Sequence, residues 1–136
     1  MASLLVVDDD ARVCDVLRRL LARAGYVVTC AGGGEEALAL LRDLRPDLVI
    51  LDWMMPGLDG LGVLRRLRAD PATAAIPVMV YTASDEPQVA RDAAALGALD
   101  CVPKVGRYTD LRERIECCLA LATRRVRGGE KIEERR

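Results

Sequence analysis

The chain contains no histidine and no phenylalanine, and its aromatic residues are one tryptophan and three tyrosines. The absence of histidine removes the usual zinc ligands and the commonest general base of enzymes. The formal net charge of -1 argues against a nucleic-acid-binding module driven by overall charge, so we expect no direct nucleic-acid partner. No apolar run approaches the length of a membrane-spanning helix, and we expect no membrane partner.

The cysteines show no pattern of a disulfide framework or of a zinc site. Their number is odd, no CxxC pair occurs, and no secretory signal precedes them. We interpret them as reduced thiols of a cytoplasmic protein that serve mostly as small core residues. These cysteines are Cys14, Cys30, Cys101, Cys117 and Cys118.

What the chain does have is a regular alternation of short aliphatic runs and amphipathic stretches. Its 136 residues suggest one domain, and 51% hydrophobic residues suffice for a core of mainly Leu, Val, Ile and Ala. Strands are predicted at about 3–7, 26–31, 48–51, 77–81 and 99–102, and helices at about 11–24, 35–44, 61–69, 86–96 and 109–123. This alternation predicts an α/β protein whose parallel sheet is covered on both faces.

Carboxylates follow two of the aliphatic runs directly. Asp8 and Asp9 follow the run at 4–7, and Asp52 follows the run at 48–51. Short runs rich in Val and Ile are typical of strands buried on both faces, and charged residues are tolerated only at their ends. The three acids should therefore meet at the carboxyl edge of one sheet. Since like charges repel unless a cation or proton intervenes, the sequence indicates a hard-metal site.

Four separated motifs resemble the receiver domain of bacterial two-component response regulators over roughly residues 3–123. They are Val6-Val7-Asp8-Asp9, the segment from Asp52 to Gly60, Val80-Tyr81-Thr82-Ala83, and Val102-Pro103-Lys104. The resemblance implies a flavodoxin-like, doubly wound sheet of five parallel strands in the order 2-1-3-4-5 with five helices. Residues 1–123 would form the receiver domain, and residues 124–136 a charged tail that is disordered or begins a linker.

The resemblance also implies a phosphorylation site at Asp52. The phosphoryl donor would be a sensor histidine kinase or a phosphotransfer protein, and the reaction would depend on Mg²⁺. Asp8, Asp9, Asp52 and the backbone carbonyl of Met54 would hold the metal, in keeping with the preference of Mg²⁺ for oxygen ligands. The protein would be a signalling domain of a phosphorelay, effectively a single-domain regulator, and not an enzyme beyond its own phosphorylation and slow autodephosphorylation.

Further residues would contact the phosphoryl group itself. By resemblance, the Thr82 hydroxyl and the backbone of Ala83 would bind phosphoryl oxygens, and the Lys104 ammonium would pair with the same group. The helix at 86–96, the strand at 99–102 and the helix at 109–123 would form the face that addresses a downstream protein.

The chain departs from the family pattern beside the lysine. The family usually carries Tyr or Phe three residues before the lysine as a switch, where this chain has Cys101. It also tends to have a cis proline after the lysine, where this chain has Val105, followed by Gly106 as a possible source of backbone relief. Trp53 is interpreted as a residue at the rim of the site.

These departures leave other functions open. One alternative is a degenerate receiver that binds proteins independently of phosphorylation. A second is a metal-dependent phosphohydrolase, although the second acid expected two residues after the nucleophile is absent, because Met54 stands there. A flavin-binding protein of similar topology is a third, and the acids disfavour it because they would repel a phosphate.

Overall fold

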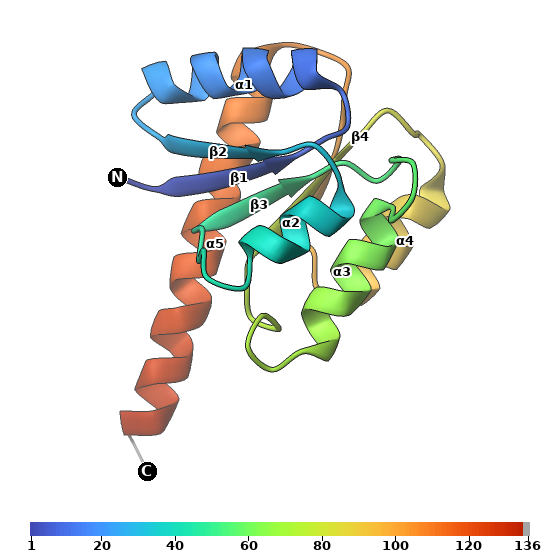
Figure 1. Cartoon of the computed structure of the whole chain (residues 1–136). Helices are drawn as coiled ribbons and strands as arrows, with labels where there is room; N and C mark the ends of the chain where they lie inside the picture. The colour runs from blue at the N-terminus through green and yellow to red at the C-terminus, as the bar shows by residue number, and fades with distance from the viewer. Residues whose placement is uncertain (135–136) are drawn as a thin grey trace.

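The fold is one parallel sheet with helices on both faces (Figure 1). The computed structural model describes residues 1–134, with side chains as far as Arg124. The strand order is β2-β1-β3-β4-β5, and all paired strands run parallel. The strands are β1 (Ser3–Val7), β2 (Val27–Ala31), β3 (Leu48–Leu51), β4 (Val78–Thr82) and β5 (Asp100–Pro103). The helices are α1 (Ala11–Arg23), α2 (Gly34–Leu40), α3 (Gly60–Ala69), α4 (Pro87–Ala95) and α5 (Tyr108–Glu134). The flavodoxin-like doubly wound fold predicted from the sequence is confirmed.

Alternate residues of the central strands pack into two separate hydrophobic cores. Leu5 and Val7 of β1 face a core shared with α2, α3 and α4, whereas Leu4 and Val6 face a core shared with α1 and α5. Successive side chains of a strand point to opposite faces, so a strand covered on both sides must be apolar throughout. That requirement explains the uninterrupted aliphatic runs, and it leaves only the strand ends for charged groups.

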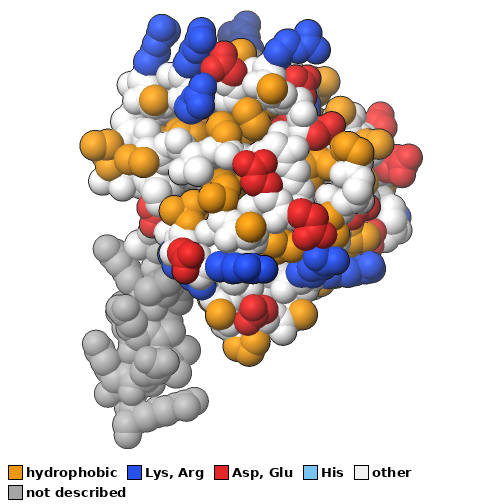
Figure 2. All heavy atoms as spheres, viewed as in Figure 1, with side chains coloured by type: hydrophobic (Ala, Val, Ile, Leu, Met, Phe, Trp, Pro, Cys, Tyr) orange, Lys and Arg blue, Asp and Glu red, His pale blue; other side chains and the backbone are white. Residues whose placement is uncertain are grey.

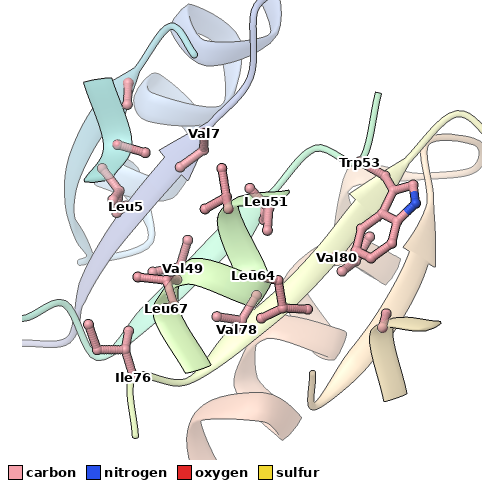
Figure 3. Packing of buried hydrophobic residues seen from close by; sticks show 14 of the residues in the cluster. Leu5, Val7, Val49, Leu51, Trp53, Leu64, Leu67, Ile76, Val78 and Val80 are labelled. Carbon is pink, nitrogen blue, oxygen red and sulfur yellow. The ribbon is translucent and has the colours of Figure 1, made fainter. Parts of the chain in front are cut away.

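The core beneath α3 illustrates this packing (Figure 3). Leu64 and Leu67 of α3 point toward Val49 of β3 and Val78 of β4, and all four side chains are almost completely buried. Burial on this scale stabilises the fold by about 1.5–3 kcal/mol for each large side chain. The rigid contact between α3 and the sheet fixes the segment that joins β3 to α3.

Helix α1 shows how the surface is solvated. Its inner side buries Cys14, Leu17 and Leu21, and its arginines lie on the outer side. Figure 2 shows these cationic side chains gathered over α1 at the top of the view. Asp10 caps the helix, because its Oδ1 accepts a hydrogen bond from the backbone N–H of Arg12 at 2.9 Å.

The boundaries differ from the prediction mainly at two helices. Helix α2 ends at Leu40, where we predicted residue 44, and turns follow it as far as residue 43. The Arg45 guanidinium donates to the carbonyl oxygens of Leu41 and Leu44, and these bonds satisfy acceptors that a longer helix would have used.

Helix α5 continues to Glu134, beyond the predicted end at residue 123. The added segment is rich in Arg, Lys and Glu, which favour helices even where apolar residues are few. The helix therefore covers most of the segment for which we expected disorder or the start of a linker, and residues 135–136 lie outside the described part. The division at residue 123 stays a prediction. Within the described part, no helix combines the length and apolar character needed to cross a bilayer.

Candidate functional site

Three acidic side chains meet at the carboxyl edge of the sheet, where β1 and β3 lie side by side. One oxygen each of Asp8, Asp9 and Asp52 lies within 4.8 Å of the others. Asp8 and Asp52 are only 2% and 5% exposed, whereas Asp9 is open to solvent. The structure therefore brings together the acids that the sequence placed at this edge, with one solvated and two buried carboxylates.

Backbone hydrogen bonds hold the two buried carboxylates in place. Asp8 Oδ1 accepts from the backbone N–H of Asp10 at 2.9 Å, and Asp52 Oδ1 accepts from that of Met54 at 3.3 Å. The backbone N–H of Asp52 donates to the Val7 carbonyl at 2.9 Å, which locks the end of β3 against β1. These bonds leave the second oxygen of each carboxylate directed to other groups.

The Lys104 ammonium is the cation of the site. Its Nζ lies 2.6 Å from Asp8 Oδ2 and 3.4 Å from Asp52 Oδ2. The backbone N–H of Lys104 donates to the Thr82 carbonyl at 2.8 Å, so the lysine stays anchored to β4. The bond to Val105 is trans, and Gly106 adopts a positive φ of 99° just beyond it. The loop thus delivers the lysine to the acids without the proline that the family pattern has after it.

Burial and neighbouring charge set the protonation of these groups. Burial, and then the charge of Asp8, raise the pKa of Asp52, while Lys104 opposes this shift. Burial would lower the pKa of Lys104, but its hydrogen bond to Asp8 and the charges of both acids outweigh burial and raise it. Lys104 therefore stays protonated and keeps Asp52 closer to ionisation than burial alone would allow.

The remaining predicted residues line the same edge. Thr82, at the end of β4, is 1% exposed, and its Oγ1 accepts from the backbone N–H of Ser84 at 3.1 Å. Ala83 lies exposed in the loop after it. The Met54 side chain is 62% exposed, so it stays outside the core, and only its backbone takes part in the prediction. The structure thus places Thr82 at the end of β4, and Met54 and Ala83 on the loops that follow β3 and β4.

Gly60 lets the start of α3 approach the segment after β3. An added Cβ at this position would lie 2.6 Å from Trp53 Cα and would also collide with the Asp52 carbonyl oxygen. The Gly60 backbone N–H donates to the Trp53 carbonyl at 3.0 Å. Glycine is therefore required at this position because the two backbones approach closely. This contact holds the backbone of Asp52 in place at the carboxyl edge of the sheet.

The interpretation of Trp53 as a rim residue is wrong. Trp53 is 8% exposed, and its indole points into the α2–α3–α4 core beside Val80 (Figure 3). Trp53 is the second residue after β3, so it continues the alternation by which Val49 and Leu51 point into the same core. Cys101 packs against the same core, so a small side chain occupies the predicted switch position, and burial raises the pKa of its thiol.

Sequence reasoning missed two contacts of Lys104. It predicted a pairing with a phosphoryl group but not the bond to Asp8, which joins residues 96 positions apart. It also missed Tyr81, whose ring centroid lies 5.7 Å from Lys104 Nζ. The sequence does show an aromatic residue directly before Thr82. Without the fold, however, nothing in the sequence identified Lys104 as the residue that its ring contacts.

The donor set fits a hard divalent cation. Mg²⁺ prefers oxygen ligands and commonly keeps several waters beside one or two carboxylates. Two buried carboxylates would supply the negative charge, and the exposed Asp9 lies where water has access. A hollow of about 450 Å³ adjoins Asp8 and Asp9 on the side of α1. Lys104 now supplies the positive charge, so a metal would share Asp8 and Asp52 with it.

Comparison with other proteins points to one family. Residues 4–116 match the response regulator receiver domain family. Response regulator MprA of Mycolicibacterium vanbaalenii is 44% identical over 122 residues, covering 88% of this chain and 51% of that protein. The phosphate regulon transcriptional regulatory protein PhoB of Pseudomonas aeruginosa is 34% identical, covering 86% of this chain and 51% of that protein. The chain spans about half the length of these curated relatives.

Solved structures agree with this match. A response regulator from Chloroflexus aurantiacus superposes with a TM-score of 0.81 at 35% identity, covering 88% of this chain and 98% of that one. The Thermotoga maritima response regulator TrrA, solved in complex with Mg²⁺ and BeF, gives a TM-score of 0.77 at 31% identity, covering 87% of this chain and 99% of that one.

Proposed function

The chain belongs to the response regulator receiver family, and from that premise we propose that Asp52 accepts a phosphoryl group in a Mg²⁺-dependent reaction. The donor is the phosphohistidine of a sensor histidine kinase or of a phosphotransfer protein. The observation that carries the proposal is the position of Asp52, which is buried beside Asp8 and has one oxygen 3.4 Å from the Lys104 Nζ. Since the chain spans about half the length of its curated relatives, the proposal concerns this domain alone.

The transfer is an in-line displacement at phosphorus. An Asp52 carboxylate oxygen forms the new O–P bond, and the N–P bond of the donor histidine breaks with its electron pair returning to the imidazole nitrogen. In the later dephosphorylation, water attacks the phosphorus, the O–P bond to Asp52 breaks, inorganic phosphate leaves, and the Asp52 carboxylate is restored. Both steps depend chiefly on positioning and on charge neutralisation, because phosphoryl transfer requires little covalent help from the protein.

The residues around Asp52 are suited to those tasks. Mg²⁺, when bound by Asp8, Asp9, Asp52 and the Met54 carbonyl, would neutralise negative charge on the transferring group. Lys104 can turn its ammonium from Asp8 toward the new phosphoryl oxygens, because its backbone is anchored at Thr82 while its side chain remains flexible. The Thr82 hydroxyl at the end of β4 and the Ala83 N–H in the loop after it would serve as donors for the same oxygens.

The signal then passes to a protein partner. By family resemblance, the output face combines α4, β5 and α5. Thr82 at the end of β4 is joined to β5 through the pairing of Thr82 with Pro103, so a movement of the hydroxyl can reach this face. The setting proposed for the reaction is the cytoplasm, where kinase and phosphotransfer partners act.

Intact-mass spectrometry with acetyl phosphate and Mg²⁺ tests the proposal. Wild-type protein should gain one phosphoryl mass that is lost on standing, and Asp52→Asn should gain none. Asp43→Asn is the matched control, because Asp43 is an exposed acid of the turn that follows α2. A wild-type protein that never gains the mass, or an Asp52→Asn variant that gains it equally, would contradict the proposal.

A further inference from the structure

The Lys104 side chain lies between two kinds of partner. On one side are the carboxylates of Asp8 and Asp52, and on the other is the ring of Tyr81, whose centroid is 5.7 Å from Nζ. An ammonium within about 6 Å of an aromatic centroid is attracted by the negative face of the ring. The lysine side chain is only 18% exposed, so little water screens this attraction. The ring therefore helps to determine where the ammonium resides.

Strand geometry places Tyr81 on the face of the sheet opposite to Cys101. Val80 pairs with Cys101 and Tyr81 pairs with Val102 across β4 and β5. Val80 and Cys101 belong to the core shared with α2, α3 and α4, whereas Tyr81 and Val102 belong to the core shared with α1 and α5. The aromatic ring near the acids thus faces the α1–α5 side, and the small thiol faces the α4 side.

Tyr81 also borders a cavity between α1 and the start of α5. The cavity has a volume of about 520 Å³, and its walls include Leu20 of α1, Val105 of the β5–α5 loop, and Tyr108 and Leu111 of α5. A ring that touches this space on one side has room to turn. The Lys104 ammonium lies over the same ring, so the ring joins the site to the cavity.

We infer that Tyr81 is a positioning residue for Lys104 and that its ring links occupancy of the acidic site to the cavity between α1 and α5. The inference rests on the proposed phosphorylation of Asp52. Without a phosphoryl group, the ammonium stays at Asp8 with the ring against it. When the ammonium turns to phosphoryl oxygens, the ring loses or changes that contact and moves with respect to the cavity walls.

The test compares Tyr81→Phe, which keeps the ring, with Tyr81→Leu, which removes it. Tyr108→Leu is the matched control, because it removes a tyrosine from the same cavity. The first measurement is the NMR shift of the Lys104 ε-methylene protons, which a ring beneath the side chain displaces upfield. Wild type, Tyr81→Phe and Tyr108→Leu should show this displacement, and Tyr81→Leu should lose it. Addition of Mg²⁺ with beryllium fluoride, a phosphoryl mimic, should change the shift in all variants that keep the ring.

The second measurement is the initial rate of phosphoryl incorporation from acetyl phosphate. The ring contact is made in the unphosphorylated state and is lost when the ammonium turns to the phosphoryl oxygens. Its removal therefore predicts a rate about two- to fivefold higher in Tyr81→Leu, with Tyr81→Phe near wild type. A wild-type rate and an unchanged Lys104 shift in Tyr81→Leu would overturn the inference. Equal changes of rate in Tyr81→Phe and Tyr81→Leu would overturn it as well, since the hydroxyl and not the ring would then matter.

Failure of the proposed function would look different. If wild-type protein took up no phosphoryl group, the rates would all be zero, whereas the Lys104 shift in the unmodified protein would still report the ring contact. The positioning of Lys104 by Tyr81 and the phosphorylation of Asp52 are therefore judged by separate readouts.

Discussion

Lys104 Nζ lies 2.6 Å from Asp8 Oδ2, and this bond joins the loop after β5 to the end of β1 across the width of the site. The same ammonium is 3.4 Å from Asp52. One cation thus offsets part of the negative charge of two buried carboxylates on different strands, and this contact helps the acidic cluster to exist in the folded protein before any metal binds.

Removal of the ammonium should destabilise the protein. We expect Lys104→Met to lower the free energy of unfolding by about 2 kcal/mol, because it leaves two buried acids without their partner. Mg²⁺ should then stabilise the variant more than wild type, since the lysine no longer competes for the carboxylates. Urea unfolding with and without MgCl₂ measures both effects. Arg107→Met, which removes an exposed cation of the same loop, is the control. A Lys104→Met protein as stable as wild type would contradict the assignment.

Mg²⁺ titration followed by tryptophan fluorescence should locate the metal. Trp53 is the only tryptophan of the chain, and it adjoins Asp52. We expect quenching in wild type and a much weaker response in Asp9→Asn, because the variant loses one carboxylate of the cluster. Asp10→Asn is the control, since Asn caps a helix about as well as Asp and Asp10 caps α1. Equal responses in wild type and Asp9→Asn would place the metal elsewhere.

Gly60→Ala should be costly, because the start of α3 lies against the backbone that follows β3. The added methyl group would meet the backbone of Asp52 and Trp53, and the rigid packing of α3 leaves little room to move. We expect a loss of about 2–4 kcal/mol in the free energy of unfolding. Gly33→Ala is the control: its φ of -177° suits alanine and nothing lies within 4 Å of the new Cβ. Similar losses in both variants would refute the close-approach argument.

The Asp100–Arg114 ion pair should make stability depend on pH. Arg114 binds Asp100 through two hydrogen bonds of 2.6 Å, and this contact lowers the pKa of Asp100 despite partial burial. A carboxylate whose pKa is lower in the folded state stabilises the protein at pH values above its unfolded pKa of about 3.9, and that contribution disappears as the pH falls through the folded value. Asp100→Asn should therefore cost about 0.5–1 kcal/mol at pH 7, and the difference should shrink below pH 4.

Thermal or urea unfolding at a series of pH values measures this difference. Glu116→Gln is the control, because Glu116 forms an exposed pair with Arg112 at 3.3 Å on the same helix. We expect its effect to be smaller at every pH. A difference between wild type and Asp100→Asn that does not change with pH would argue against the pair as the cause.

Much of the fold follows from local sequence. The aliphatic runs that become β1 and β3 admit only one placement of their acids, because a buried strand accepts charge only at its ends. The convergence of Asp8 and Asp52 could therefore be predicted from two short segments. Their roles toward Mg²⁺ and phosphoryl groups remain proposals, as do those of Met54, Thr82, Ala83 and Cys101.

Other features depend on contacts that no short segment encodes. The length of α5 was underestimated because its last turns are stabilised by propensity and not by an apolar face. Trp53 is buried because its ring belongs to the core shared with α3 and the sheet, which its position directly after the charged Asp52 did not indicate. The bond of Lys104 to Asp8 required the strand order to be known, and its contact with Tyr81 required the register of β4 against β5.

The direction of α5 has a practical consequence for experiments on this protein. The helix begins beside the carboxyl edge of the sheet and runs back past the opposite edge, so its far end lies remote from the acids (Figure 1). A dye, an affinity handle or a surface tether attached at that end would leave the carboxylates open to docking proteins. Binding kinetics on a surface and single-molecule recordings can therefore use protein that is attached through the far end of α5.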